Sequence, residues 1–518
     1  MENEWRKPLL NGSRDGEPTS PSDRKEGKNP GSVTGPRNVQ CTLKDGSIAK
    51  HKWDIPAIKE ELKTQVLIAL PMVLVNFLQY SVLVVSIMFV GHLGELELAS
   101  ASLANSIASV LGLYILLGMA GSVETLCGQA YGAGQYHMLE KYVQRAVFVL
   151  CCTCVPLTVL FLNMESILLL LGQAPDIAAK AAEYVICLLP ALYASAFLQP
   201  LVRFLQTQSI VRPMAYCAAV TLTLHVALCW LVVFKLDLGF RGSAIATSVS
   251  YWMNVLLLVT FVKLSNCCEK TWVNGFSREA FTDLKPFLRL AVASSVMLCL
   301  EYWAFEIVVL AAGLLANPEL ELSALSICLN TTTLNYMIPL GLGAAASTRV
   351  SNEMGAGNPA AVRRAIKVVM SMSFTVAVGV SSSLFLARNI WGAVFSSDSE
   401  VVAYVSTIMP FLSCIVLCDG LQGVLQGVVR GSGWQDLGVV INLVCFYVFG
   451  VPTGILLAFR FGWAGKGLFT GILTGLGCQV LGLLVISLHT NWEEQAEIAH
   501  TRQITTSSKG ESAEVHAV

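Results

Sequence analysis

Apolar residues fill long stretches of this chain, and polar residues are largely confined to the short segments between them. A helix needs about 20 residues to cross about 30 Å of hydrocarbon, and stretches of that length recur from Val66 to Leu488. The pattern predicts an all-α polytopic membrane protein with twelve transmembrane helices. Their approximate spans are 66–90, 99–126, 143–170, 181–207, 213–236, 241–264, 287–315, 321–347, 365–388, 400–428, 436–459 and 464–488.

The second half of the chain repeats the first at a spacing of about 223 residues. The sequence ELEL at Glu95–Leu98 recurs at Glu319–Leu322, and GAG at Gly132–Gly134 recurs at Gly355–Gly357. An even number of helices per copy means that both copies enter the membrane from the same side, so their symmetry axis lies along the membrane normal. We therefore predict two six-helix lobes around a cleft, related by an internal parallel repeat.

This organisation predicts five segments. They are a disordered cytoplasmic N-terminal tail (1–58), an N-lobe with helices 1–6 (59–264), a cytoplasmic inter-lobe linker (265–285), a C-lobe with helices 7–12 (286–490) and a cytoplasmic C-terminal tail (491–518). The tail at the start is rich in Gly, Pro, Ser, Lys and Asp and cannot bury enough apolar surface to fold alone. Lys and Arg are concentrated on the side of the N-terminus, which predicts cytoplasmic termini. The vacuolar membrane and the plasma membrane both fit that orientation.

Composition excludes several classes of function. Only 13% of residues are charged and 54% are hydrophobic, so a water-soluble fold is excluded and the lipid bilayer, not nucleic acid, is the expected surrounding. The chain has no nucleotide-binding Gly-x-x-x-x-Gly-Lys-Ser/Thr motif and no His-Glu-x-x-His zinc motif. Its 16 cysteines show no spacing typical of metal ligands or disulfides. We expect no enzyme activity, no metal and no cofactor, with an ion gradient as driving force and a monomer as functional unit.

Two acidic residues lie inside predicted membrane helices of the second half. Glu301 is near the middle of helix 7 and Asp419 is within helix 10, whereas their counterparts in the first half are the uncharged Gln79 and Ala196. A charged group at the bilayer centre costs about 2.5 to 3.5 kcal/mol, so it needs a partner, a watery cavity or a proton. The asymmetry of the repeat predicts that the chemistry is in the second half.

If both carboxylates line one cavity, desolvation and mutual repulsion favour a site that holds either a proton or a cation. The alternative is a pair of structural carboxylates satisfied by hydroxyls or amides. Glu306 follows Glu301 by five residues and points about 140° around the helix, so it is a secondary candidate together with Gln79 and Gln422.

Further polar and helix-bending residues extend the candidate site. Asn330 and Tyr336 lie in a polar group of helix 8 and complete a hydrogen-bonded site or, alternatively, join helices to one another. Pro71 and Pro339 interrupt helices and are hinge candidates. Glu124 lies near the cytoplasmic end of helix 2, where a role in an inner gate or in helix capping is expected. We interpret Arg349 and Arg430 mainly as interfacial anchors.

Four motifs resemble those of multidrug and toxic compound extrusion (MATE) transporters, in particular the plant detoxification branch. They are VGHLG at Val90–Gly94, ETLCGQAYGA at Glu124–Ala133, AASTRVSNE at Ala345–Glu353 and VRGSGWQ at Val429–Gln435. The resemblance runs from about Glu60 to Trp492. It implies twelve helices in two lobes and export of organic solutes, such as xenobiotics, secondary metabolites and organic cations, from the cytosol in exchange for protons by alternating access.

In similar eukaryotic transporters, acidic residues of helices 7 and 10 bind protons and cationic substrate, which implies these roles for Glu301 and Asp419. The resemblance places Asn330 and Tyr336 among the polar site residues of helix 8. Many prokaryotic relatives use a helix 1 aspartate, where this chain has Asn76 and Gln79. The alternatives are a transporter of the same fold for flavonoid glycosides, organic anions such as citrate, or a hormone, and, from another class, a non-transporting receptor or an intramembrane enzyme.

Overall fold

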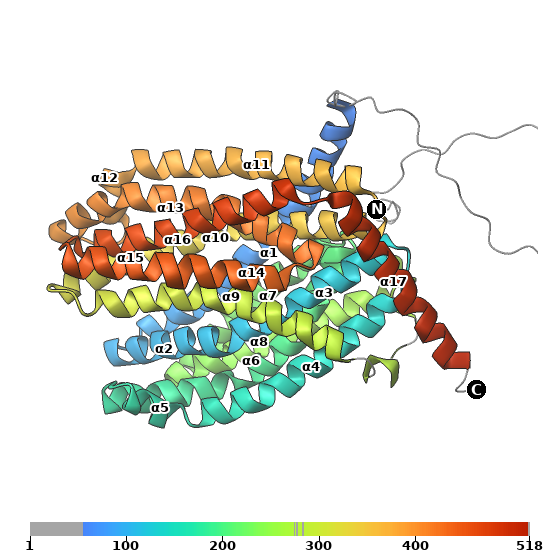
Figure 1. Ribbon diagram of the computed structural model, residues 1–518. Helices are drawn as coiled ribbons and strands as arrows, with labels where there is room; N and C mark the ends of the chain where they lie inside the picture. Colours follow the sequence, from blue (N-terminus) through green and yellow to red (C-terminus); the bar gives the residue numbers. More distant parts are fainter. Residues whose placement is uncertain (1–54, 274, 276–277, 282–283, 516–518) are drawn as a thin grey trace, which may run out of the picture. The chain divides into compact units, whose positions relative to one another are not determined.

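Long helices make up almost all of the described chain. The computed structural model describes residues 55–273, 275, 278–281 and 284–515, so most of the predicted N-terminal tail lies outside the described residues. The chain forms two units, Met1–Lys59 and Glu60–Val518, and the arrangement below is that within Glu60–Val518. Figure 1 shows the long helices of this unit running side by side.

Twelve helical spans follow one another in the described residues. Those of the first half are α1 (Ile55–Gly91), α2 (Glu95–Ala108) continued by α3 (Tyr114–Gly132), α4 (His137–Leu162), α6 (Pro175–Thr207), α7 (Arg212–Trp230) and α8 (Gly239–Leu264). Those of the second half are α9 (Leu284–Ala312), α10 (Pro318–Gly355), α11 (Pro359–Leu386), α13 (Ser399–Ser432), α14 (Gln435–Asn442) continued by α15 (Val451–Ile455), and α16 (Ala464–His489). Shorter helices outside the spans are α5 (Met164–Leu170) and α12 (Arg388–Trp391), and α17 (Trp492–Val515) follows the last span.

Within the described residues, eleven of these spans are long and apolar enough to cross a membrane. The exception is α10, which has 38 residues but carries a polar run over 330–333 and Asn335 that lowers its hydropathy. Helix α10 packs against α3, α11 and α13, and Thr331 and Thr332 of the polar run are buried, whereas Asn330 is exposed. The predicted all-α polytopic fold is confirmed.

Several predicted boundaries differ from the structure. Helix α1 begins at Ile55, before the predicted span 66–90 and inside the predicted tail 1–58. Two further differences have a local cause. The expected span 143–170 is divided into α4 and α5 at Asn163, whose side-chain amide donates a hydrogen bond to the Val159 carbonyl (2.8 Å). Such local side-chain bonds compete with the helical ladder. Residues 492–515, expected as part of a C-terminal tail, form helix α17, whose buried Trp492, Ala496 and Ala499 recur at helical spacing.

The duplicated GAG sequence ends α3 and α10 in the same way. Gly134 and Gly357 have φ angles of 75° and 65°, a left-handed conformation that glycine adopts without steric cost. The next residues, Gln135 and Asn358, each donate a backbone hydrogen bond (2.9 Å) to the carbonyl five residues earlier, which makes a Schellman cap at both ends. The sequence repeat is therefore also a repeat of helix endings.

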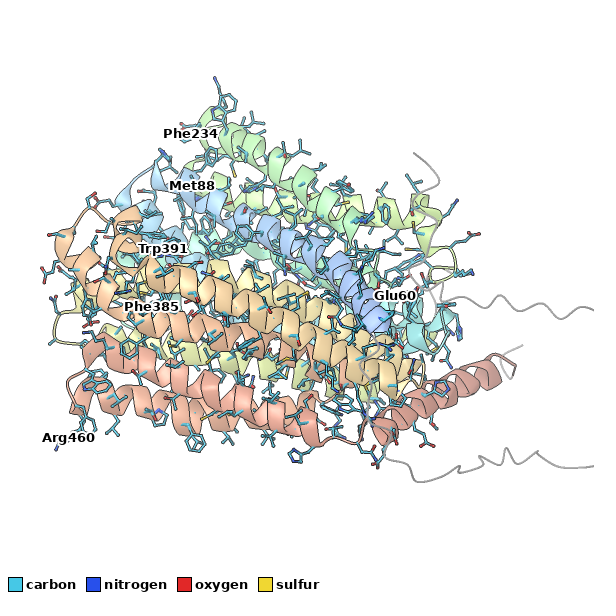
Figure 2. All side chains as sticks on the ribbon, turned by 90° about the horizontal axis from the view of Figure 1, so that it is seen from above. Glu60, Met88, Phe234, Phe385, Trp391 and Arg460 are labelled. Carbon is cyan, nitrogen blue, oxygen red and sulfur yellow. The ribbon has the colours of Figure 1, made fainter. Side chains whose placement is uncertain are left out.

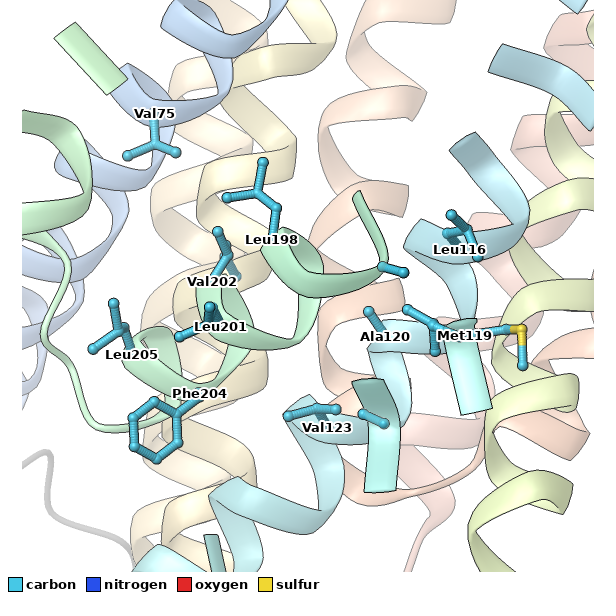
Figure 3. Packing of buried hydrophobic residues seen from close by; sticks show 14 of the residues in the cluster. Val75, Leu116, Met119, Ala120, Val123, Leu198, Leu201, Val202, Phe204 and Leu205 are labelled. Atoms are coloured by element: carbon cyan, nitrogen blue, oxygen red, sulfur yellow. The ribbon is translucent and has the colours of Figure 1, made fainter. Parts of the chain in front are cut away.

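Apolar packing fixes the helices that border the site. In the first half, Leu116 and Val123 of α3 and Leu198 and Phe204 of α6 are buried in one cluster (Figure 3). Figure 2 shows α1, from Glu60 to Met88, between green helices of the first half and orange helices of the second. Two contacts agree with this view, since Ser86 of α1 bonds to Thr247 of α8 and a Cβ atom on Gly341 of α10 would meet Val73 of α1.

Candidate functional site

Glu301 is held by amide groups in the interior of the second half. It lies on α9 with 4% of its surface exposed. Its carboxylate accepts hydrogen bonds from Nε2 of Gln422 (2.9 and 2.8 Å) and from Nε2 of Gln426 (2.5 Å), both on α13. Within the described part of the chain, no basic side chain forms an ion pair with Glu301. The amides stabilise the ionised carboxylate without neutralising its charge.

Asp419 precedes Gln422 by one turn of α13 and is 5% exposed. It lines a small cavity between α10, α11 and α13 together with Asn335, Pro339 and Ser373. No donor among the described residues forms a hydrogen bond to its carboxylate. The nearby Ser373 hydroxyl donates to the Gly420 carbonyl instead (2.7 Å). A buried carboxylate without a donor or a cation is costly unless it holds a proton.

Aromatic side chains surround the two carboxylates. Tyr336 of α10 is near enough to interact electrostatically with both Glu301 and Asp419, which also interact with each other. Tyr302 follows Glu301 and stacks on Tyr114 of α3, with ring centroids 3.9 Å apart and planes at 17°. The structure therefore brings three of the four principal predicted site residues together beside an aromatic contact between the halves.

Asn330 lies elsewhere. It lines a pocket of about 310 Å³ with Tyr80, Ile87 and Met88 of α1 and Leu98 of α2. Six residues separate it from Tyr336 along α10, which places the two side chains more than one turn apart. On this helix it is Asn335, not Asn330, that shares a cavity with Asp419.

Of the secondary candidates, only Gln422 forms a hydrogen bond to a carboxylate of the site within the described residues, whereas Glu306 and Gln79 do not. Glu306 lies near enough to Ser106 of α2 to interact with it, so it points toward the first half. Gln79 is half-buried on α1 and, within the described residues, makes no hydrogen bond to either carboxylate, whereas Gln422 binds Glu301. Of the hinge candidates, Pro71 lies inside α1 and Pro339 lies inside α10, where it lines the Asp419 cavity.

Glu124 joins the two halves at one end of the bundle. It is 1% exposed and its carboxylate pairs with Arg203 of α6 (2.8 Å) and with Arg430 of α13 (3.1 Å). Its repeat counterpart, Ser347, lies beside it. We name the surrounding contacts the inter-half seal, and its members are Glu124, Thr125, Gln129, Arg203, Gln206, Thr348, Asn352 and Arg430.

The neutral part of the inter-half seal follows the internal repeat. The Thr125 hydroxyl of α3 donates to the Arg430 carbonyl of α13 (2.5 Å), and the equivalent Thr348 hydroxyl of α10 donates to the Gln206 carbonyl of α6 (3.4 Å). Because each bond runs from one half to the other, the two form a related pair about the pseudo-twofold axis.

A second pair of hydrogen bonds has the same symmetry. The Gln129 amide of α3 donates to the Gly431 carbonyl (3.3 Å), and the equivalent Asn352 amide of α10 donates to the Thr207 carbonyl (3.1 Å). The seal is therefore an interface that the two repeats make with each other, and the Glu124 ion pairs are its asymmetric addition.

Arg349 is buried and Arg430 is mostly buried, and each forms ion pairs with acidic side chains. Arg349 is 8% exposed and pairs with Glu61 of α1 (2.8 Å) and with Glu353 (2.7 Å). Their interpretation as mainly interfacial anchors was wrong, because the acidic partners Glu61 and Glu124 are distant in sequence and only the fold brings them near. Glu124 itself, predicted for a gate or a cap, contacts both halves.

Sequence reasoning missed Gln426 at Glu301, and from the polar group of helix 8 it selected Asn330 rather than Asn335. A usable signal was present, since Gln426 follows Asp419 by seven residues and Gln422 by four, which puts all three on one face of a helix. Within the described ranges, no three His, Cys, Asp or Glu side chains are grouped as metal ligands.

Comparison with known proteins gives the family. The MatE family model matches the chain twice, over residues 71–231 and 293–456, once in each half. Protein DETOXIFICATION 16 of Arabidopsis thaliana is 50% identical over 452 residues, which covers 87% of this chain and 93% of that protein. Protein DETOXIFICATION 17 of the same plant is 49% identical over 86% of this chain and 93% of its own length.

Solved structures of MATE transporters match this chain as well. The crystal structure of the eukaryotic MATE transporter AtDTX14 has a TM-score of 0.83 at 44% identity and covers 86% of this chain and 100% of that chain. An outward-facing multidrug resistance MATE transporter matches in fold alone, with a TM-score of 0.75 at 15% identity over 87% of this chain and 99% of its own. These relatives confirm a transporter of small molecules rather than an enzyme. The chain belongs to the MATE family of multi-pass membrane transporters and is of the detoxification type.

Proposed function

We propose that the protein is a proton-coupled antiporter that exports organic solutes, organic cations among them, from the cytosol by alternating access. The observation that carries this proposal is the pair Glu301 and Asp419. Both carboxylates are nearly fully buried and interact with each other, and neither has a cationic partner among the described residues. Buried acids in this situation can exchange a proton for a cationic substrate, which is the minimum chemistry of antiport.

In the proposed cycle, a proton from the extracellular or luminal side neutralises the carboxylate site and displaces the substrate. The halves then rearrange, the proton leaves to the cytosol, and a new substrate binds. The closed inter-half seal supports an outward-facing arrangement in this structure, because its hydrogen bonds join α3 and α6 to α10 and α13 at one end of these helices. One pH unit supplies about 1.4 kcal/mol per proton.

We place the inter-half seal on the cytoplasmic side, together with both termini, in a vacuolar or plasma membrane. The support is the positive excess of that side of the sequence, to which Arg203, Arg349 and Arg430 belong. A protease-protection experiment with a tag after Val518 tests the orientation in sealed right-side-out vesicles. Cleavage only after detergent addition agrees with it, and cleavage in intact vesicles contradicts it.

Efflux from reconstituted vesicles tests the proposed function. An imposed pH gradient should drive an organic cation across the membrane with the parent protein. Glu301→Gln or Asp419→Asn should abolish that transport, because each replaces a carboxyl group by an amide that cannot take up and release a proton. Glu183→Gln is the matched control, since Glu183 pairs with Arg241 at an exposed position, and it should transport like the parent.

A flavonoid glycoside and citrate, assayed side by side with the cation, distinguish the alternative substrates. If the gradient drives only the anion or the glycoside, the substrate class is wrong while the coupling stands. If both carboxylate variants transport as well as the parent, the coupling residues lie elsewhere.

A further inference from the structure

A continuous polar stripe runs along α13 from the carboxylate site to the inter-half seal. Its members are Asp419, Gln422, Gln426 and Arg430, at spacings of three, four and four residues. This spacing keeps all four side chains on one face of the helix. At one end of the stripe Asp419 lines its cavity, and at the other end Arg430 pairs with Glu124 of α3. We call these four residues the α13 stripe.

The two glutamines of the stripe donate to Glu301 in an arrangement that favours its ionised form. Three contacts reach Glu301 from the Nε2 atoms of Gln422 and Gln426, and hydrogen bonds donated to a carboxylate stabilise its charged form. The Oε1 atoms of both glutamines are buried and accept no hydrogen bond from the described residues. An unpaired buried acceptor costs about 1 to 3 kcal/mol.

These unpaired oxygens match what a protonated Glu301 needs. A carboxylic acid has one O–H that must be donated, and rotation of either amide by about 180° about its last bond would present Oε1 to it. The released Nε2 would then need a new acceptor, so the side chain and its helix must adjust. Gln479 of α16 also lies near enough to interact with Glu301, and its buried Oε1 accepts no hydrogen bond from the described residues, while its Nε2 donates to Asn442 (2.7 Å).

We propose that Gln422 and Gln426 are positioning residues that couple protonation of Glu301 to the inter-half seal through α13. The inference rests on the proposed proton-coupled function and names the residues that regulate its site. Arg430 follows Gln426 by one turn, so a displacement of α13 that accommodates the rotated amide also displaces the Arg430 partner of Glu124. A rigid helix transmits such a displacement between two packed contacts.

Several other ionisable side chains lie near Glu301. From the elements packed against it these are Asp419 and Arg430 of α13, Tyr336 of α10 and, on its own helix, Tyr302. All of them remain in the variants tested below, so a change in pH dependence is assigned to the glutamines.

The test measures pH-driven efflux over a range of external pH with Gln426→Met and Gln422→Met. Methionine keeps the length of the side chain but donates no hydrogen bond to the carboxylate, so the protonated form is favoured. The pH of half-maximal efflux should rise by about one unit, because a hydrogen bond to a charged group is worth about 1.5 kcal/mol or more. Gln199→Met is the matched control, because Gln199 is the repeat counterpart of Gln422 and should leave the midpoint unchanged.

A second readout follows the seal itself. Hydrogen–deuterium exchange of residues 125–132, at the sealed end of α3, should change with pH in the parent protein at the same midpoint as efflux. In the double variant Gln422→Met with Gln426→Met, this pH dependence should be lost. Melting temperatures show which variants are folded, and if a methionine variant unfolds, Gln426→Asn, which keeps the amide but is one methylene shorter, should give the same midpoint shift.

These measurements distinguish a failure of proton-coupled transport from a failure of the role of Gln422 and Gln426. If the parent shows no pH-driven efflux, the proposed function itself fails. If the parent is pH-driven and the folded glutamine variants retain its midpoint and its exchange profile, the positioning role of Gln422 and Gln426 is overturned.

Discussion

The buried carboxylates of the inter-half contacts and of the candidate site differ in whether a cation lies beside them. Glu61 and Glu124 each contact arginine at the sealed end, whereas Glu301 has only amides and Asp419 has no donor among the described residues. A carboxylate between two guanidinium groups stays ionised, so it acts as a fixed link. The other two can change charge, and this difference is why we assign transport chemistry to them alone.

At the residue scale we predict that Glu124→Gln destabilises the protein by about 3 kcal/mol, because it leaves Arg203 and Arg430 buried without their counter-charge. Glu97→Gln is the control, since Glu97 pairs with Lys180 at a partly exposed position and its loss should destabilise the protein much less. Denaturant unfolding in detergent micelles measures both. Equal losses for the two variants would show that the Glu124 pairs are no stronger than a surface ion pair.

At the scale of elements, α3 and α10 approach each other most closely where the duplicated glycines lie. A Cβ atom on Gly132 would lie 1.8 Å from the Asn352 carbonyl oxygen, and one on Gly355 would lie 2.0 Å from the Gln129 carbonyl oxygen. The pair obeys the same repeat symmetry as the hydrogen bonds of the inter-half seal. Helix α17 covers this place, because His500 hydrogen-bonds to the Gly355 carbonyl (2.7 Å).

We therefore predict that Gly132→Ala and Gly355→Ala each force the two helices apart and reduce pH-driven efflux at least tenfold, since a backbone clash below 3 Å cannot be relieved by a side chain. Gly379→Ala in α11 and Gly477→Ala in α16 are matched controls with open space around the added methyl group. Efflux rates together with melting temperatures provide the measurement. Parent-like efflux in both seal variants would contradict the importance of this close approach.

Hydropathy was sufficient to predict most helices, but it could not predict which residues distant in sequence contact each other. Eleven of the twelve spans follow from apolar length, and the position of Gln422 and Gln426 on the Asp419 face of α13 follows from helical spacing. By contrast, Arg349 and Glu61 are 288 positions apart and Arg430 and Glu124 are 306 apart, so no local pattern links them. The break at Asn163 also depends on a side-chain hydrogen bond that hydropathy does not register.

At the scale of the whole molecule, the internal repeat explains both the seal and its asymmetry. Two related halves meet through equivalent bonds of α3 with α13 and of α10 with α6. Such an interface can open and close as a unit when the halves move relative to each other. Ionisable groups have been added to only one copy of the carboxylate site, which gives the cycle a single place where a proton can control it.

Proton uptake driven by an outward substrate gradient is the first measurement to make, because it tests whether substrate export is coupled to proton entry through Glu301 and Asp419. Vesicles that contain the reconstituted protein and a pH-sensitive dye receive an outward gradient of an organic cation with no initial pH difference. The account predicts that substrate leaving the vesicles drives protons inward, so that the interior acidifies with the parent protein and not with a Glu301→Gln, Asp419→Asn double variant. Substrate efflux with no change in internal pH would contradict proton-coupled antiport.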